Sequence, residues 1–152
     1  MPRFQFRLQQ YLGIKEQIEN QKELEYAKAL RLLEEEKQKL VDFIRSRDEA
    51  VENLRTRVAE VISPFEIRRL NNNIERLKQQ IIQQKERVAA AETFAEQKRQ
   101  ELVQAMKERK ALETVKENAR EEFLIEANLA EQKEVDELVS FKYAKLGETP
   151  IP

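Results

Sequence analysis

The side chains in this sequence that could do chemistry are almost all carboxylates. The chain has 152 residues, with 29 Asp and Glu, 28 Lys and Arg, and neither His nor Cys. Without imidazole or thiol it lacks the common zinc ligands, cysteine nucleophiles and the general base most used near neutral pH. Two glycines are too few for a glycine-rich loop around a nucleotide phosphate. We therefore expect no catalytic residue, no cofactor and no enzymatic activity.

A cluster of acidic residues near the C-terminus is the group whose spacing comes nearest to a metal site. It consists of Glu131, Glu134, Asp136 and Glu137. Hard cations prefer oxygen ligands that converge from a tightly turning loop, whereas these residues would lie on successive faces of one helix. We interpret the cluster as a solvated charged face that suits a basic partner surface, and we expect no bound metal.

The net charge and the short apolar runs argue against two further classes. A formal net charge of −1 provides no basic field for nucleic acid. No apolar run approaches the roughly 20 residues that cross a bilayer. The first ten residues contain no apolar segment typical of a secretory signal. We expect a cytoplasmic chain that binds no nucleic acid and does not insert into a membrane.

Apolar residues recur at the spacing of about 3.5 residues that is typical of a coiled coil, along two stretches. The core positions of the first stretch are Leu30, Leu33, Lys37, Leu40, Ile44, Arg47, Val51, Leu54, Val58 and Val61. Those of the second are Ile67, Leu70, Ile74, Leu77, Ile81, Gln84, Val88, Ala91, Ala95, Lys98, Leu102, Ala105, Arg109, Leu112, Lys116, Ala119 and Phe123. The pattern predicts long helices over about residues 4–61 and 65–146.

A helix-start signal separates the two stretches. Ser63 can cap the second helix, with Pro64 at its first position and Glu66 completing a capping box. Ile62 and Ile67 would form the accompanying hydrophobic staple. A turn at about residues 62–64, near Ser63 and Pro64, therefore predicts an antiparallel two-helix hairpin rather than one kinked helix.

Reversing the chain at this turn places apolar residues opposite one another. The predicted pairs include Val58 with Leu70, Leu54 with Ile74, Leu40 with Val88, Tyr26 with Leu102, and Phe4 with Phe123 or Leu124. The predicted fold class is all-α, with a single elongated coiled-coil domain over residues 1–152. Its second helix would extend some twenty residues past the first before Gly147 caps it and a short tail, residues 147–152, follows.

Three surfaces of this hairpin could bind partners. The extension carries an apolar stripe of Val135, Leu138, Val139, Lys142 and Leu146, unless it folds against the first helix or pairs with another copy. The N-terminal end has more apolar side chains than one helix can cover, and these serve either the core or docking. They are Phe4, Phe6, Leu8, Tyr11, Leu12 and Ile14. The third surface lies just past the turn and contains Ile67, Leu70, Ile74 and Leu77.

Three segments of the chain resemble the FliJ family of the flagellar type III export apparatus. They are FQFRLQQYLGIKE (Phe4 to Glu16), PFEIRRLNNNIERLKQQI (Pro64 to Ile81) and EQKEVDEL (Glu131 to Leu138). The order and position of the segments and the hairpin layout agree with the family across essentially the whole chain. The closing segment is the most specific, because heptad spacing alone does not dictate its residues.

This resemblance implies a function that the heptads alone do not. Proteins of the family look like the coiled coil of a rotary-ATPase gamma subunit, insert their terminal end into the hexameric export ATPase, and contact the membrane export-gate protein and export chaperones. By position, the ATPase-binding residues would be Gln132, Lys133, Val135, Asp136, Glu137, Leu138, Phe4, Phe6 and Leu8. Gate-binding residues would be Leu70, Ile74 and Leu77, with Asn73 standing where related sequences can carry an aromatic residue.

The resulting hypothesis is a non-catalytic stalk that regulates the export ATPase at the cytoplasmic side of the cell membrane, at the base of the flagellum. Two other functions fit the same sequence. One is a cytosolic adaptor that escorts export substrates and their chaperones, and the other is the equivalent stalk of a non-flagellar type III secretion system. An unrelated structural coiled coil is the third alternative.

Overall fold

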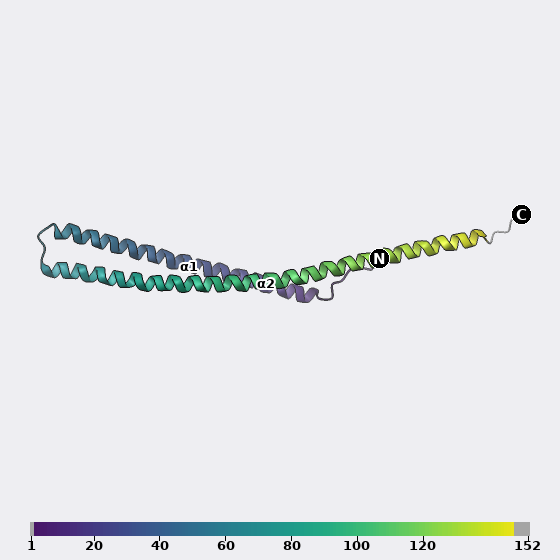
Figure 1. Cartoon of the computed structure of the whole chain (residues 1–152), viewed down its shortest axis with the longest axis horizontal. Coiled ribbons are helices and arrows are strands. Elements are labelled where there is room, and N and C mark those ends of the chain that lie inside the picture. Colours follow the sequence, from purple (N-terminus) through teal and green to yellow (C-terminus); the bar gives the residue numbers. More distant parts are fainter. Residues whose placement is uncertain (1, 148–152) are drawn as a thin grey trace. The chain divides into compact units, whose positions relative to one another are not determined.

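The computed structural model describes residues 2–147, which form two helices and, within that range, no strand. Helix α1 spans Gln9–Val58 and helix α2 spans Pro64–Gly147 (Figure 1). The all-α prediction is confirmed. Two compact units divide the chain: unit 2 contains residues 18–105, and unit 1 contains residues 1–17 and 106–152. The prediction of one domain over the whole chain stays a prediction.

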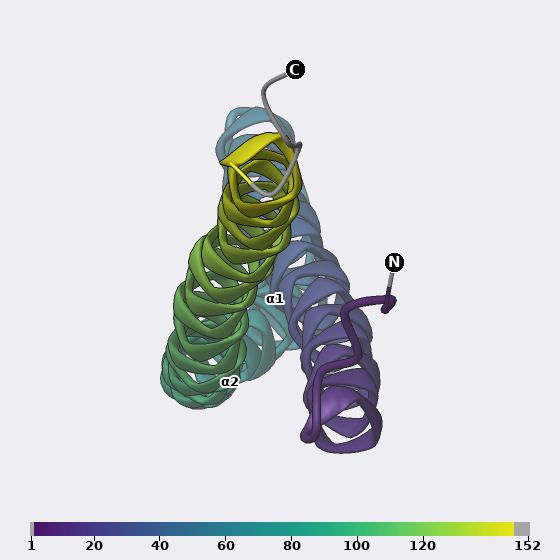
Figure 2. The ribbon, with the colours of Figure 1, turned by 90° about the vertical axis from the view of Figure 1, so that its right-hand side faces the viewer.

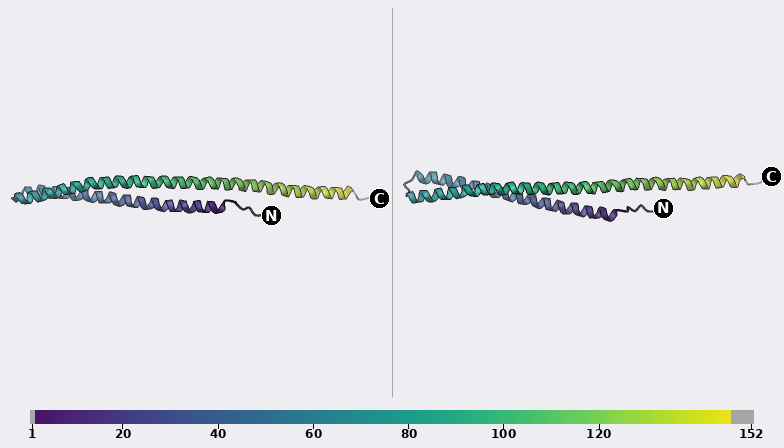
Figure 3. Two further views of the ribbon diagram at one scale, coloured as in Figure 1. Left: turned by 90° about the horizontal axis from the view of Figure 1, so that it is seen from below. Right: turned by 60° about the horizontal axis from the view of Figure 1, so that its bottom comes forward.

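In unit 2 the two helices run side by side in opposite directions (Figures 1 and 3). Near the turn, Arg57 of α1 forms an ion pair with Glu66 of α2, at 3.0 Å. Far from the turn, Lys22 of α1 lies 3.7 Å from Glu101 of α2. Residue numbers rise along α1 as they fall along α2, which confirms the antiparallel hairpin.

The register between the helices differs from the predicted one in unit 2. A reversal at Ser63 and Pro64 would set Lys22 opposite Met106, but Lys22 contacts Glu101. The reason lies in the turn, which occupies residues 59–63 because α1 ends at Val58 rather than near residue 61. The midpoint of the hairpin therefore falls earlier in the chain, and each residue of α1 meets an earlier residue of α2.

The predicted core positions of α2 are confirmed along the whole stretch from Ile67 to Phe123. Every one of them is buried or half-buried, including the charged Lys98, Arg109 and Lys116. The least exposed are Ile74, Leu77, Ile81, Gln84, Ala91, Ala95 and Ala105. Small alanine side chains at three of these positions allow the two backbones to approach closely.

The predicted core positions of α1 are partly wrong. Leu30 and Lys37 are exposed, and the residues that face α2 there are their neighbours Ala29 and Glu36. Val58 and Val61 are also exposed, because Val58 ends the helix and Val61 lies in the turn. The first stretch holds adjacent leucines at residues 32 and 33 beside Leu30, so its apolar pattern admits more than one helical face.

The start of α2 has the predicted N-cap without the full capping box. Ser63 Oγ accepts a hydrogen bond from the Glu66 N–H at 3.3 Å, and the Ser63 carbonyl accepts one from the Ile67 N–H. The Glu66 carboxylate contacts Arg57 across the turn instead of reaching back to Ser63. This cross-helix contact ties the last turn of α1 to the first turn of α2.

Two polar layers interrupt the apolar core of unit 2. Gln84 is buried, and its Nε2 donates hydrogen bonds to the Glu36 carbonyl at 2.9 Å and to the Glu36 carboxylate. Further along, Lys22 and Glu25 of α1 alternate with Lys98 and Glu101 of α2 in a closed ring of four ion pairs at 3.2 to 3.7 Å. Each layer contains polar contacts that cross between the helices, namely Gln84 with Glu36, and Lys22 and Lys98 with Glu101 and Glu25, so each layer favours one register.

Unit 1 begins with a segment that is not helical, contrary to the prediction of helix from residue 4 (Figure 2). Phe4 and Phe6 are half-buried whereas Gln5 and Arg7 are exposed, an alternation typical of extended chain. The Phe4 ring packs against Phe123 of α2, with centroids 5.6 Å apart, as predicted. An extended residue spans about 3.3 Å against 1.5 Å in a helix, so the segment reaches farther along α2 than helix would.

The far end of α2 differs from the predicted cap. Gly147 is still helical and has no positive φ, so it does not form a left-handed cap. Pro150 and the predicted tail beyond Gly147 lie outside the described residues.

Candidate partner-binding surfaces

The C-terminal part of α2, residues 128–147, is exposed at every position; we call it the overhang. In unit 1 the N-terminal segment packs along α2 as far as Phe123, and the helix continues alone past it (Figures 1 and 3). Its exposed large apolar residues are Leu129, Val135, Leu138, Val139, Phe141, Tyr143 and Leu146. The predicted unpaired extension of the second helix is therefore present.

The residues predicted to bind the ATPase surround this helix rather than sharing one face. At about 100° per residue, Val135 and Leu138 lie on one side, Gln132 and Asp136 on a second, and Lys133 and Glu137 on a third. All six are exposed. A partner that contacted all of them would have to enclose the helix.

The three N-terminal residues of the same prediction have different environments. Phe4 and Phe6 are half-buried, and Phe4 packs on Phe123 just before the overhang begins. Leu8 is 40% exposed. Phe4 thus anchors the N-terminal segment on α2, and Leu8 is the most exposed of the three.

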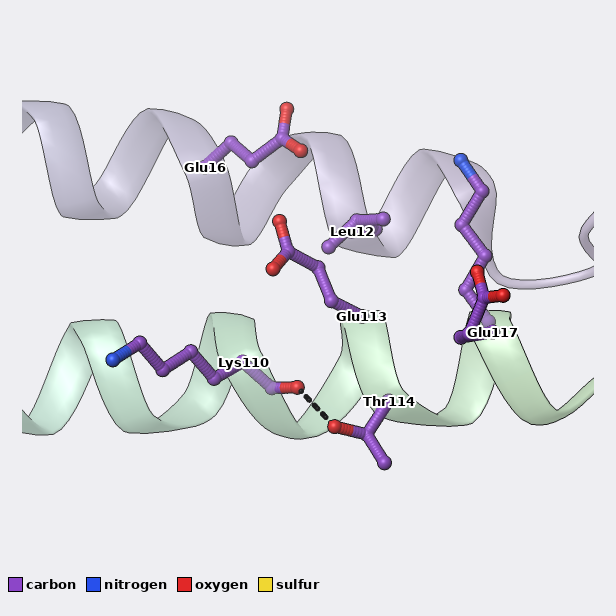
Figure 4. Close-up of a pocket in the computed structure, with 7 residues that line it drawn as sticks. Leu12, Glu16, Lys110, Glu113, Thr114 and Glu117 are labelled. Carbon is purple, nitrogen blue, oxygen red and sulfur yellow. Dashed lines mark hydrogen bonds between the residues drawn. The ribbon is translucent and has the colours of Figure 1, made fainter.

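An open hollow of about 610 Å³ lies between the helices of unit 1 (Figure 4). Leu12 of α1 and Glu113 of α2 point toward the space between the helices, and the Thr114 hydroxyl donates a hydrogen bond to the Lys110 carbonyl at 3.0 Å. Nearby, Lys15 of α1 forms an ion pair with Glu108 of α2 at 3.1 Å. Both acidic and basic side chains line the hollow, and they do not converge on one point.

The residues predicted to bind the export gate lie mainly in the interhelical core. Ile74 and Leu77 are 6% and 8% exposed, and Leu70 is half-buried. Asn73 is also half-buried and accepts a hydrogen bond from Arg76 at 2.9 Å. Their assignment to the gate stays a prediction, but a partner can reach Ile74 and Leu77 only if the helices separate.

An apolar cluster at the turn was not predicted from the sequence. It consists of Val58, Val61 and Phe65, all exposed, with Phe65 at 76%. The sequence assigned Val58 and Val61 to the core because both fit the heptad spacing. The helix end that exposes them has no glycine or proline to mark it.

Hydrogen bonds and ion pairs shift the pKa of four charged groups in the hairpin. The hydrogen bond from Gln84 lowers the pKa of the Glu36 carboxyl, and that from Gln21 lowers the pKa of Glu25. Glu108 raises the pKa of Lys15, and Glu101 raises that of Lys98. Each shift favours the charged form of the group.

The surfaces of residues 2–147 hold no converging set of three or more metal-ligating side chains. The acidic residues near the C-terminus lie on different sides of α2, as the helical spacing predicts. Neither helix contains, within the same residues, a stretch apolar and long enough to cross a bilayer.

Comparisons with known proteins identify the family. The sequence matches the family described as "Flagellar FliJ protein" over residues 4–148. Among solved structures, the chain is similar to CT670 from Chlamydia trachomatis, which is described as a YscO homologue. The TM-score is 0.67 at 25% sequence identity, and the match covers 97% of this chain and 100% of CT670. No curated protein matches the chain.

The family match spans both helices, the turn and the overhang, and it agrees with the resemblance of the three sequence segments. The similarity to CT670 likewise extends over nearly the whole of both chains. The chain belongs to the FliJ family of type III export components.

Proposed function

We propose that this protein is a non-catalytic stalk of the flagellar type III export ATPase. The overhang would enter the central pore of the ATPase hexamer, and the paired part of the hairpin would face the membrane export gate and the export chaperones. This work would take place in the cytoplasm, at the base of the flagellum. Hydrolysis would belong to the ATPase, because this chain offers no nucleotide-binding loop.

The observation that carries the proposal is the exposure of α2 on all sides from residue 128 to residue 147. A single helix with its side chains is about 10–12 Å across, which suits a narrow pore, and this one is about 30 Å long. Gln132, Lys133 and Leu138 point in three different directions, so an enclosing ring would find a contact on every side.

The three sides of the overhang are chemically different, and this suits a regulator of identical subunits. One side is apolar around Val135 and Leu138, while Asp136 and the Lys133–Glu137 side are charged. Subunits around the helix would therefore make unequal contacts with it. A stalk that binds one subunit conformation better than another shifts the populations of those conformations.

The N-terminal segment would fix the base of the overhang. Phe4 packs on Phe123, five residues before the overhang starts. In the proposed complex Phe4 and Phe6 hold this junction, and Leu8 adds a direct contact at the rim of the hexamer.

The gate contact is proposed for the turn of the hairpin and the first turns of α2. Leu70 would contribute its exposed edge, whereas Ile74 and Leu77 would act by holding α2 against α1. Loss of gate binding in variants of Ile74 or Leu77 is then expected only together with loss of stability.

The proposal is tested with the purified export ATPase, by measuring turnover and hexamer formation with and without this protein. We expect stimulation by the full chain and none after deletion of residues 131–152. The paired charge reversal Lys133→Glu with Glu137→Lys should weaken the effect, while Lys37→Glu, an exposed position of α1 in unit 2, should leave it unchanged. Equal stimulation by the deletion variant would assign the contact to another surface, and no binding by the full chain would reject the stalk.

The escort adaptor is the second candidate function, and the exposed cluster of Val58, Val61 and Phe65 favours it. Contiguous exposed apolar surface on a folded protein marks sites of protein interaction. An adaptor would bind export chaperones in the absence of the ATPase and would lose that binding in Phe65→Ser. The stalk of a non-flagellar system would instead stimulate the ATPase of that system in preference to the flagellar one.

A further inference from the structure

The apolar stripe of the overhang does not continue the face that α2 turns toward α1. Heptad spacing extended past Phe123 reaches mainly polar residues, namely Glu126, Ala130, Lys133, Glu137, Ser140 and Ala144. Leu124, Val135 and Leu138 belong to a second register, which at about 100° per residue lies more than a quarter of a turn away. Its positions are Leu124, Asn128, Glu131, Val135, Leu138, Lys142 and Lys145.

We propose that this second register is a coiled-coil interface with the overhang of a second copy of the chain, in antiparallel orientation. The two-fold axis passes between Asp136 and Glu137. In antiparallel coiled coils an a position of one helix faces a d position of the other, so Val135 packs against Leu138 of the second copy. By symmetry the same contact forms twice.

Charge complementarity selects the antiparallel orientation. With the axis at this place, Glu131 faces Lys142 of the second copy, again twice by symmetry. In a parallel dimer Glu131 would instead face Glu131, and Lys142 would face Lys142, which is repulsive. Within residues 2–147 neither side chain has an ion pair of its own, so both are available to the second copy.

The flanks of the stripe add apolar surface to the interface. Val139 and Leu146 lie along one edge and Phe141 along the other, and all three are exposed. With the axis at this place, the contact runs from Asn128 to Lys145, which is about 26 Å of helix. Since two apolar layers lie between charged layers, we expect a weak dimer whose affinity falls as salt rises.

The dimer would cover the surface that the proposed stalk function needs, so each copy would keep the overhang of the other away from the ATPase. That consequence depends on the proposed function, whereas the dimer itself does not. The test therefore uses this protein alone, and its outcome is independent of the ATPase assay.

Sedimentation equilibrium of the full chain at low salt, over concentrations from micromolar to millimolar, measures the association. Glu131→Lys and Lys142→Glu should each weaken it at least about tenfold, since each creates two like-charge contacts. The double variant should restore it to within about threefold of wild type. Glu126→Lys makes the same charge change at a position outside the second register, so it should leave the association unchanged.

A chain that stays monomeric throughout would overturn the proposal. So would a double variant that remains as weak as the single variants. Single variants that associate as strongly as wild type would also overturn it, because in a parallel dimer each charge reversal only exchanges one like-charge contact for another. The overhang variants leave the interhelical core untouched, and an unchanged helix content by circular dichroism confirms that each has folded.

Spin labels give the orientation directly, because the chain has no native cysteine. In the antiparallel dimer, the two labels on Asp136→Cys lie at nearly the same position along the helix axis. Labels on Ala144→Cys are separated by about 20 Å more along the helix axis. Equal label separations at the two sites would show a parallel pairing and contradict the proposal.

Discussion

The paired and unpaired parts of α2 have similar compositions and opposite surroundings. From Ile67 to Phe123 every heptad core position is at least half-buried, whereas from residue 128 onward every side chain is exposed. The apolar residues of the first part stabilise the hairpin. Those of the overhang contribute nothing to the hairpin, so their spacing is free to serve binding. One helix thus contains a part that stabilises the hairpin and a part that is exposed to solvent on all sides.

The largest expected difference between the two parts concerns equivalent apolar truncations. Ile81→Ala removes a side chain that is 4% exposed and should lower the free energy of unfolding by about 2–5 kcal/mol. Leu138→Ala removes one that is 62% exposed and should change it by less than about 0.5 kcal/mol. Urea denaturation followed by circular dichroism measures both. Equal losses would mean that the overhang is covered in the free protein.

The next largest effect concerns the polar layer of the paired part. Gln84→Ala removes the side chain that donates to Glu36 across the helix pair, and we expect a loss of about 1–3 kcal/mol. Gln132→Ala in the overhang is the matched control, because its side chain is exposed, and it should have almost no effect on stability. A neutral Gln84→Ala would show that the layer does not stabilise this register.

Much of this comparison could be predicted from the sequence, because α2 carries a clear start signal and an unbroken heptad pattern. Ser63 and Pro64 determine where α2 begins, and the residues that face α1 follow from that point. The end of α1 has no such signal, and Val58 to Ile62 are compatible with helix. The wrong register in unit 2 and the missed cluster around Phe65 both follow from the absence of a signal for the end of α1.

The polar contacts between the helices could not be predicted from the sequence for a different reason. Gln84 was predicted at a core position, but the predicted register does not bring Glu36 to it. The half-formed capping box has a similar origin, since Glu66 pairs with Arg57 from the other helix rather than with Ser63. Local spacing predicts local partners, and it cannot rank them against partners that only the folded chain brings near. At the N-terminus, the alternation of Phe4 and Phe6 with polar residues was the available sign of extended chain.

A smaller effect is expected at the end of the paired part, where α1 contains Gly13. A Cβ atom added at Gly13 would have no obstructing heavy atom within 4 Å. The residue lies in a helix and its φ is not positive, so alanine fits its backbone conformation. Gly13→Ala should therefore stabilise the protein, by about 0.5–1 kcal/mol. Thermal unfolding measures the change. A destabilised Gly13→Ala would mean that this end of α1 is packed more tightly than the structure shows.

The smallest effect concerns pH and the ion pairs. The pKa values of Glu25 and Glu36 are lowered from 4.5. Their contribution to the stability of the fold is therefore present above pH 4.5 and is lost as the pH falls through the lowered pKa values. The pKa values of Lys15 and Lys98 are raised from 10.5. Their contribution to the stability of the fold is complete below pH 10.5 and is lost as the pH rises through the raised pKa values. Thermal unfolding across pH should show a broad plateau, with small losses below about pH 4.5 and above about pH 10.5. High salt should reduce both losses, and a loss near neutral pH would contradict this assignment.

Amide hydrogen exchange of the protein, at a concentration where it is monomeric, tests most directly whether the overhang is a binding element separate from the fold. Amides of residues 128–147 should exchange much faster than those of residues 67–123 in the free protein, and should become protected when the export ATPase is added. Equal protection of both parts without a partner, or protection by the ATPase that spares the overhang, would contradict the account.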